Sequence, residues 1–242
     1  MLFRSEEHEG IWRLLDGSNV VVATAKKVVI AAAIDSKPLI NSLGVHLPLK
    51  PVRGQLSIFS IQPNDPWVSM LPKVGISGDG YCLPAEQLED GSYRWMVGSS
   101  FDEGEDDLSP REDSDNFNRG QAKGLVDYAD GDPRSLVKAG EFVGVRCVSG
   151  DRLPIIGPLA QRPGIFLATA LGSRGILWSA LAAKLVSAQL LGDDFALLAR
   201  LGFAADLVAA LAPARFLAGA LAAPGALASN SKPIFPSEPS AK

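Results

Sequence analysis

Two segments in the second half of the chain hold residues that could bind an anionic or planar ligand. Residues 144–157 place Arg146 and Arg152 around a Gly-Asp turn, and residues 172–176 read Gly-Ser-Arg-Gly-Ile. An arginine fork can make two parallel charge-assisted hydrogen bonds to a carboxylate, so Arg146 is a candidate carboxylate receptor. The alternative is a structural ion pair with an acidic neighbour such as Asp151. Glycines at a strand-to-helix turn allow close approach of a planar ligand, and the helix start offers free N–H groups.

Strands and helices must position these segments. Apolar patterning predicts strands over 11–15, 19–25, 27–32, 49–60, 141–148 and 165–170, and a hairpin between 80–85 and 93–101. Helices are predicted over 35–43, 176–191 and 114–128, the last capped by Asp113 or Ser114. The continuous apolar run 27–32 is typical of a parallel strand covered on both faces.

The order of these elements predicts a mixed α/β (α+β) fold. Residues 1–45 and 141–222 suggest α/β layering, residues 46–140 an inserted antiparallel sheet, and residues 223–242 a disordered tail. An inserted sheet often forms the roof of a ligand cavity at the junction. Arg53 and Gln55, on the predicted strand 49–60, are candidates to line that cavity; the alternative for Arg53 is an exposed arginine on the strand.

Composition narrows the class of protein. The net charge is −4, and residues 86–115 hold eleven acidic and two basic side chains, which is most simply an acidic solvated loop. The chain shows no dense basic stripe, and its apolar region 195–228 is interrupted by charges and a proline. We therefore expect no membrane span. Two cysteines favour a reducing, cytoplasmic compartment, and no His/Cys cluster has the spacing of a metal site.

Several short motifs carry a resemblance to known flavoenzymes. Arg146, residues 151–157 and residues 172–175 resemble the D-amino-acid-oxidase and glycine-oxidase superfamily. Residues 51–55, 144–147, 151–154, 170–175 and 211–215, in that order and spacing, are similar to one branch: the FAD-dependent oxidoreductase half of the bifunctional tRNA 5-methylaminomethyl-2-thiouridine biosynthesis proteins.

The resemblance implies a three-layer FAD-binding domain that carries an inserted substrate-binding sheet. It implies FAD as cofactor, contacted by Ala32 and by Gly172, Ser173, Arg174, Gly175 and Ile176, with Arg146 binding the substrate carboxylate. The implied reaction is oxidative removal of the carboxymethyl group from carboxymethylaminomethyl-(2-thio)uridine at the tRNA wobble position. The implied partners are tRNA and an upstream methyltransferase domain.

The chain departs from this family in two places. Nothing in it reads Gly-x-Gly-x-x-Gly, the turn that holds the FAD pyrophosphate, so the FAD-binding part is expected to be incomplete and its other half to come from a separate segment. Residues 31–33 are all alanine where relatives carry a glycine. Two alternatives therefore stay open: a glycine- or D-amino-acid-type oxidase acting on a small free amine, and a non-catalytic fragment unable to hold FAD alone.

Overall fold

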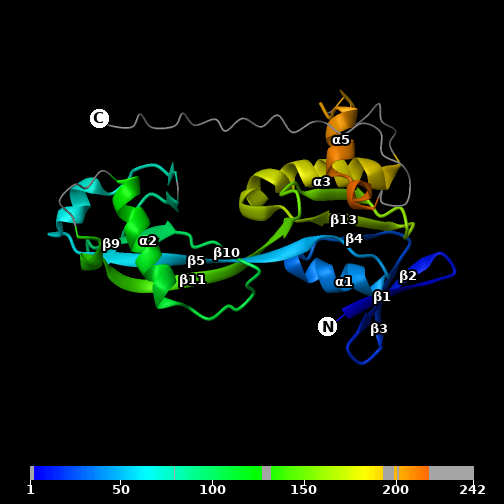
Figure 1. Ribbon diagram of the computed structural model, residues 1–242, viewed down its shortest axis with the longest axis horizontal. Helices are drawn as coiled ribbons and strands as arrows, with labels where there is room; N and C mark the ends of the chain where they lie inside the picture. The colour runs from blue at the N-terminus through cyan, green and yellow to red at the C-terminus, as the bar shows by residue number, and fades with distance from the viewer. Residues whose placement is uncertain (1–2, 79, 127–131, 193–198, 201, 218–242) are drawn as a thin grey trace, which may run out of the picture.

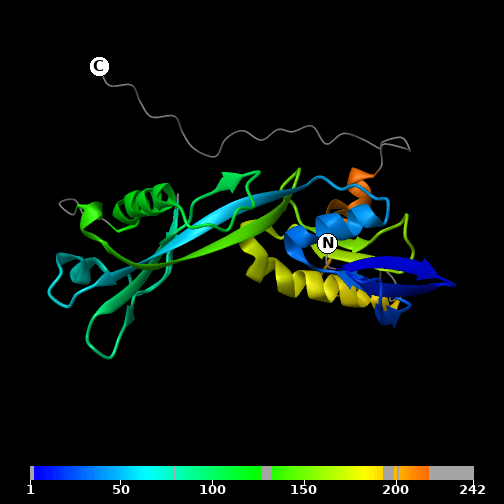
Figure 2. The same cartoon turned by 90° about the horizontal axis from the view of Figure 1, so that it is seen from below.

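Two long paired strands connect the two ends of an elongated molecule. The computed structural model describes residues 3–78, 80–126, 132–192, 199–200 and 202–217. Strands β5 (Leu49–Ile61) and β11 (Val137–Ser149) run antiparallel along their length, from the end that holds helix α2 (Glu112–Leu125) toward the end that holds helix α3 (Gly175–Leu191) (Figure 1). Seen from below, they lie side by side across the middle of the molecule (Figure 2).

The largest sheet is built on β5. Its hydrogen-bonded order is β10 (Asp102–Glu103), β5, β9 (Tyr93–Gly98), β7 (Tyr81–Cys82) and β6 (Ile76–Ser77); β11 also pairs with β5, and β8 (Glu86–Gln87) with β9. Alternate side chains of β5 and β9, among them Phe59 and Trp95, are fully buried in one core with Ala122 of α2. Helix α2 therefore covers one face of this sheet.

The other end of the molecule contains a small mixed sheet. Strand β4 (Val28–Ile30) pairs in parallel with β13 (Ile165–Thr169), and β12 (Ile155–Pro158) pairs antiparallel with β13. The 17-residue helix α3 packs on it through Leu185 and Val186, together with α5 (Ala205–Leu211). Helix α1 (Ser36–Ser42) contributes Ile40 to a second core with Leu167. None of the described helices is long and apolar enough to cross a membrane.

A separate antiparallel meander precedes this sheet in the chain. It consists of β1 (Phe3–His8), β2 (Ile11–Asp16) and β3 (Val21–Ala25). Short 3₁₀ turns occur at Ala33–Asp35, Pro66–Met70, Pro133–Ser135, Gly172–Arg174 and Pro213–Phe216.

The mixed α/β class predicted from the sequence is confirmed, including the parallel pairing of residues 28–30. Helix α2 starts earlier than predicted: its cap is Arg111, not Asp113 or Ser114, and those two residues lie in its first turn. Strand β1 was not predicted, because half of its residues are charged and it shows no apolar alternation. The proposed tail 223–242 lies outside the described residues, and the division at residues 45/46 and 140/141 stays a prediction.

Candidate cofactor and substrate site

A cavity of about 300 Å3 lies where β11 passes the end of β13. We call it the turn cavity. The first residues of α3 and the turn before them form one wall, and the segment after β4 forms another. Its lining is mostly small or apolar: Ala31, Ala33, Val145, Arg146, Cys147, Ala168, Thr169, Ala170, Leu171, Gly172 and Gly175. The two glycine-flanked segments singled out from the sequence therefore meet at one cavity.

The backbone around the turn cavity is held in unusual conformations. Ala33 and Ala170 both have positive φ, of 47° and 58°, which is costly for residues with a Cβ atom. The Thr169 hydroxyl donates a hydrogen bond of 3.0 Å to the carbonyl of Ala33 and so ties the two segments together. Strained backbone that the surroundings hold in place is frequent at ligand sites.

No side chain caps the start of helix α3, which lies at this cavity directly after the 3₁₀ turn Gly172–Arg174. Its first residue, Gly175, lines the cavity, its cap residue Arg174 makes no capping hydrogen bond through its side chain, and the first turn holds no acidic residue. The N–H groups at a helix start carry a partial positive charge. This end of the cavity therefore suits an electron-rich ligand edge.

The guanidinium of Arg146 is half-buried and has no carboxylate within 4 Å among the described residues. Its Nη2 donates a short hydrogen bond to Ser99 Oγ, its Nη1 donates to the Ser100 carbonyl at 3.4 Å, and its Cζ lies 5.5 Å from the centroid of the Phe101 ring. Burial lowers the pKa of Arg146, against the opposing effects of Tyr81 and Asp102. In the part of the chain that the structure describes, this partly buried cation forms no direct ion pair, so it is suited to bind an anionic ligand.

The alternative partner considered for Arg146, Asp151, is engaged elsewhere. Its carboxylate accepts two hydrogen bonds from Arg215, at 2.7 and 3.1 Å, and further ones from Ser149 Oγ and the Leu153 N–H. Burial alone would raise the pKa of Asp151, but these hydrogen bonds lower it to about 2. The ion pair joins the turn after β11 to the segment after α5, and it leaves Arg146 free for a ligand.

A second cavity, of about 340 Å3, shares Arg146 with the first. We call it the sheet cavity; it is lined by Gly54, Leu56, Tyr81, Phe142, Gly144, Val145 and Arg146. Cross-strand pairing places Phe142, Leu56, Gly98 and Tyr81 in one row across β11, β5, β9 and β7. This row lies on the sheet face opposite α2, because Gln55 and Ser57 on the other face bond to Asp115 of α2.

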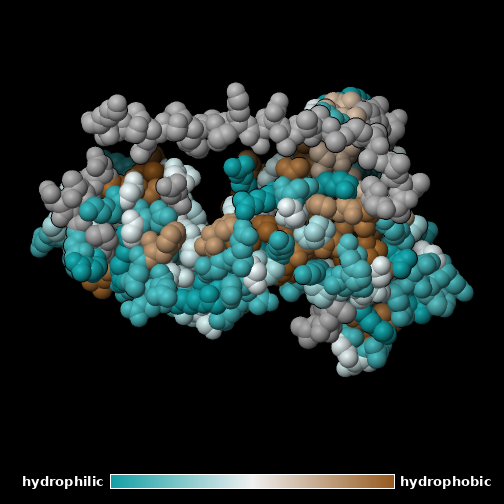
Figure 3. Space-filling model, viewed as in Figure 1, coloured by the Kyte–Doolittle hydropathy of each residue, from teal (hydrophilic) through white to brown (hydrophobic). Residues whose placement is uncertain are grey.

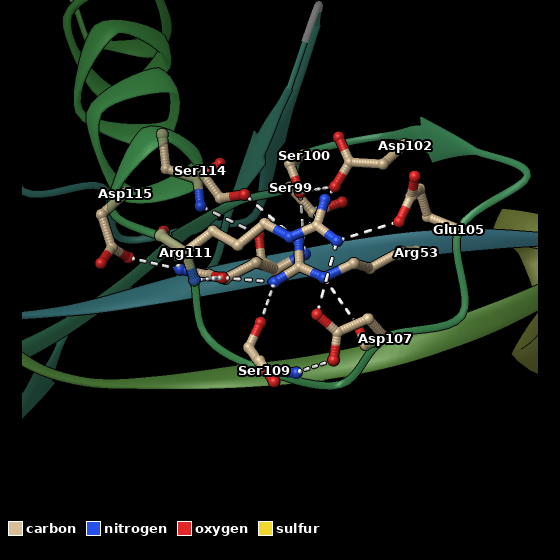
Figure 4. Close-up of polar contacts among 12 residues, drawn as sticks. Arg53, Ser99, Ser100, Asp102, Glu105, Asp107, Ser109, Arg111, Ser114 and Asp115 are labelled. Atoms are coloured by element: carbon tan, nitrogen blue, oxygen red, sulfur yellow. Dashed lines mark hydrogen bonds and ion pairs between the residues drawn. The ribbon is translucent and has the colours of Figure 1, made fainter.

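Arg53 and Gln55, which we predicted to line a substrate cavity, lie away from both cavities described above. Arg53 is 0% exposed, and neither residue borders either cavity. Its guanidinium donates to Asp102, Ser114 and Gln55, and to the backbone carbonyls of Asp107 and Ser109 (Figure 4). Arg53 pairs with Val145 across the ladder, whereas Arg146 pairs with Val52, so the two arginines lie on opposite faces. Arg53 fastens the acidic loop to the sheet.

Some of the residues predicted to contact the cofactor line the turn cavity, and others are exposed on the surface. Gly172 and Gly175 line the turn cavity, whereas Ser173 and Arg174 are exposed and Ile176 is 94% exposed. Ala32 does not line it although both of its neighbours do; its N–H bonds to Ser36 Oγ. Figure 3 shows hydrophobic surface near the middle of the molecule, beside α3.

Sequence reasoning missed the segment that holds Arg146 in place. Ser99, Ser100 and Phe101 contact its guanidinium from a loop nearly fifty residues earlier in the chain, and no local pattern marks them. The exposed Phe142 was also missed, since it occurs within an ordinary strand pattern. Within the described residues, no cluster of three His, Cys, Asp or Glu side chains could hold a metal ion.

Comparison with known proteins defines the class. A family model described as "FAD dependent oxidoreductase" matches residues 3–189, and the chain belongs to that family. The fold agrees: glycine oxidase from Geobacillus kaustophilus superposes with a TM-score of 0.64 over 81% of this chain and 49% of its own, at 22% identity. L-proline dehydrogenase from P. horikoshii superposes with a TM-score of 0.65 over 90% of this chain and 54% of its own, at 15% identity.

Curated relatives point to one branch of this family. The chain is 36% identical over 242 residues to the tRNA 5-methylaminomethyl-2-thiouridine biosynthesis bifunctional protein MnmC of Ralstonia nicotianae, covering 88% of this chain and 34% of the relative. It is 34% identical over 244 residues to the protein of the same name from Burkholderia cenocepacia, covering 91% of this chain and 35% of that relative. The chain thus spans about a third of the length of these relatives. The resemblance predicted from the sequence motifs is confirmed.

Proposed function

We propose that this chain supplies the substrate-binding sheet and part of the flavin site of a cytoplasmic FAD-dependent amine oxidoreductase that acts on tRNA. Its substrate would be the carboxymethylaminomethyl group of a wobble (2-thio)uridine. The observation that carries this proposal is Arg146, a desolvated guanidinium without a carboxylate partner among the described residues, at the wall shared by two cavities. The names of the curated relatives support the tRNA substrate.

The turn cavity fits the edge of a flavin. Its lining of alanines and glycines leaves the backbone accessible, and the start of α3, which no side chain caps, offers N–H groups beside Gly175. Within the predicted set, Gly172 and Gly175 would hold the ring edge. When bound, FAD supplies the two-electron oxidation of the carbon–nitrogen bond next to the carboxylate. The resulting imine would take up water and split into glyoxylate and an aminomethyl uridine.

The protein's own part in this chemistry is binding and orientation. Arg146 would hold the carboxylate by its fork, which places the neighbouring methylene and amine at the mouth of the turn cavity. The apolar side chains of Val145 and Leu171 would exclude water from the reacting bond. No histidine lines either cavity, and oxidation of a neutral amine requires no protein base as an obligatory partner.

We further propose that another segment holds the FAD pyrophosphate, because the 242 residues include no Gly-x-Gly-x-x-Gly turn. That segment, and the upstream methyltransferase domain that the sequence resemblance implies, are the proposed protein partners. The purified chain is then expected to be colourless. A yellow preparation with one FAD per chain would overturn this part of the proposal.

Analysis of tRNA nucleosides tests the function. Cells that lack the gene should accumulate carboxymethylaminomethyl-(2-thio)uridine, and the wild-type gene should restore the aminomethyl product or its derivatives. Arg146→Gln should reduce turnover about ten- to a hundredfold, the value of one charge-assisted pair. Arg152→Gln is the matched control, since that side chain is exposed and pairs with Glu103. Unchanged tRNA, with oxidation of free glycine instead, would favour the small-amine alternative.

A further inference from the structure

Two glycines face each other across the β5–β11 ladder, and a planar side chain lies over each. Gly144 is the direct cross-strand partner of Gly54. A Cβ atom on Gly54 would come within 2.6 Å of Cζ of Arg146, and a Cβ atom on Gly144 within 3.2 Å of Cε1 of Phe142. A side chain at either position would have to displace the planar group that lies over it. The Arg146 guanidinium and the Phe142 ring therefore each pack directly against the backbone of a glycine, and these two glycines are cross-strand neighbours.

The Phe142 ring leaves a large apolar surface in contact with solvent. It is 63% exposed, on the sheet face that α2 does not cover. A phenyl ring buries well when a partner covers it, and stacking on an aromatic face is a common way to bind a nucleobase. Leu56 and Tyr81 border the same sheet cavity, and its lining includes no carboxylate.

We propose that the sheet cavity binds the pyrimidine ring of the substrate by stacking on Phe142 and on the face of the Arg146 guanidinium. This inference rests on the proposed function and names the part of the site that would recognise the base. The fork edge of a guanidinium can bind a carboxylate while its flat face stacks on a ring. Arg146 thus holds the carboxylate, and Phe142 holds the ring to which that group is attached.

The spacing of the two planar groups agrees with the shape of this substrate. Directly opposed residues of antiparallel strands have Cα atoms about 5 Å apart, so the groups seated on Gly54 and Gly144 are near neighbours. A carboxylate attached to the ring through a short CH2–NH–CH2 linker could reach Arg146 while its ring covers Phe142. A free amino acid would fill only the Arg146 end.

Equilibrium binding to the purified chain tests the inference with two probes. One is the nucleoside 5-carboxymethylaminomethyluridine, and the other is N-methylglycine, which carries the same carboxymethylamino group without the ring. Phe142→Ala should weaken nucleoside binding about tenfold or more, the usual effect of removing one stacked aromatic, and change N-methylglycine binding by less than about twofold. Phe142→Trp should retain nucleoside binding. Phe117→Ala is the matched control, a 49% exposed phenylalanine on α2.

The outcomes separate the two proposals. Arg146→Gln should lower the affinity for both probes. If this variant lowers neither affinity, or if the wild-type chain binds neither probe, the proposed function is refuted, and the proposed base site is refuted with it. If Arg146→Gln weakens both probes but Phe142→Ala leaves the nucleoside affinity unchanged, stacking is refuted and the proposed function stands. Because Phe142 is exposed, its variants should keep the wild-type melting temperature, which circular dichroism checks.

Discussion

Replacing Asp151 by Asn should make the protein less stable near neutral pH and remove part of its acid sensitivity. The carboxylate is bound by Arg215 at 2.7 and 3.1 Å, and its pKa lies near 2 instead of 3.8. A shift of that size corresponds to about 2 kcal/mol. The Asp151 side chain is 36% exposed, however, so solvent screening reduces the expected contribution to about 1 kcal/mol.

The sign of the pH dependence follows from the lowered pKa. Well above pH 3.8 the carboxylate is ionised in both the folded and the unfolded chain, and the full stabilisation is present. As pH falls from 3.8 toward 2, the unfolded chain takes up a proton before the folded chain does, and the stabilisation is lost. Between pH 5 and pH 2, the wild-type free energy of unfolding should therefore fall about 1 kcal/mol further than that of Asp151→Asn.

Urea unfolding followed by tryptophan fluorescence, at a series of pH values, measures this difference. A double-mutant cycle with Arg215→Met should give a coupling energy of about 1 kcal/mol at pH 7 that disappears at pH 2. The Arg215 side chain also bonds to the carbonyls of Leu211 and Ala212, so its single substitution should cost more than that of Asp151. Identical pH profiles for the wild type and Asp151→Asn would refute the reasoning.

Three further predictions concern the backbone, the core and the thiols. Ala33→Gly should raise the free energy of unfolding by about 0.5–1 kcal/mol. Glycine removes the strain of a positive φ at this position, and this gain exceeds the loss from the extra conformational entropy that glycine gives the unfolded chain. A higher melting temperature of the variant would confirm the prediction. Leu185→Ala, fully buried in α3, should cost about 2–5 kcal/mol in urea unfolding. Burial raises the pKa of the Cys82 and Cys147 thiols, so iodoacetamide at pH 7 should label both slowly until urea unfolds the chain; rapid labelling of the folded protein would contradict their burial.

Elements that depend on local pattern could be predicted from the sequence. The apolar run that contains β4 indicated a parallel strand, and the glycine-flanked turn before Ile176 marked the start of α3 to within one residue. Arg146, Gly172 and Gly175 also line one cavity, but it was the family resemblance that led us to expect both segments at one site, not a local pattern.

Features that depend on pairing between distant segments could not be predicted. The surroundings of Arg53 could not be predicted because its face of the sheet is set by the register of β5 with β11, and four of its five hydrogen bonds go to residues 49 to 61 positions away. The hydrogen bond from Arg146 to Ser99 could not be predicted either, because it also joins segments that are far apart in the sequence. Positive φ at Ala33 could be suspected only from a family resemblance, since alanine itself carries no signal for that conformation.

The strict alternation of β11 has a consequence for how this protein can change during evolution. Deleting one residue just before Arg146 would turn the guanidinium toward the covered side of the sheet, where the buried donors and acceptors around Arg53 leave no room for a second cation. Removing two neighbouring residues would restore its direction and shift it along the strand by one repeat. Homologues are therefore expected to differ in the length of this strand by even numbers of residues, with odd differences confined to bulges such as that between Lys138 and Gly140.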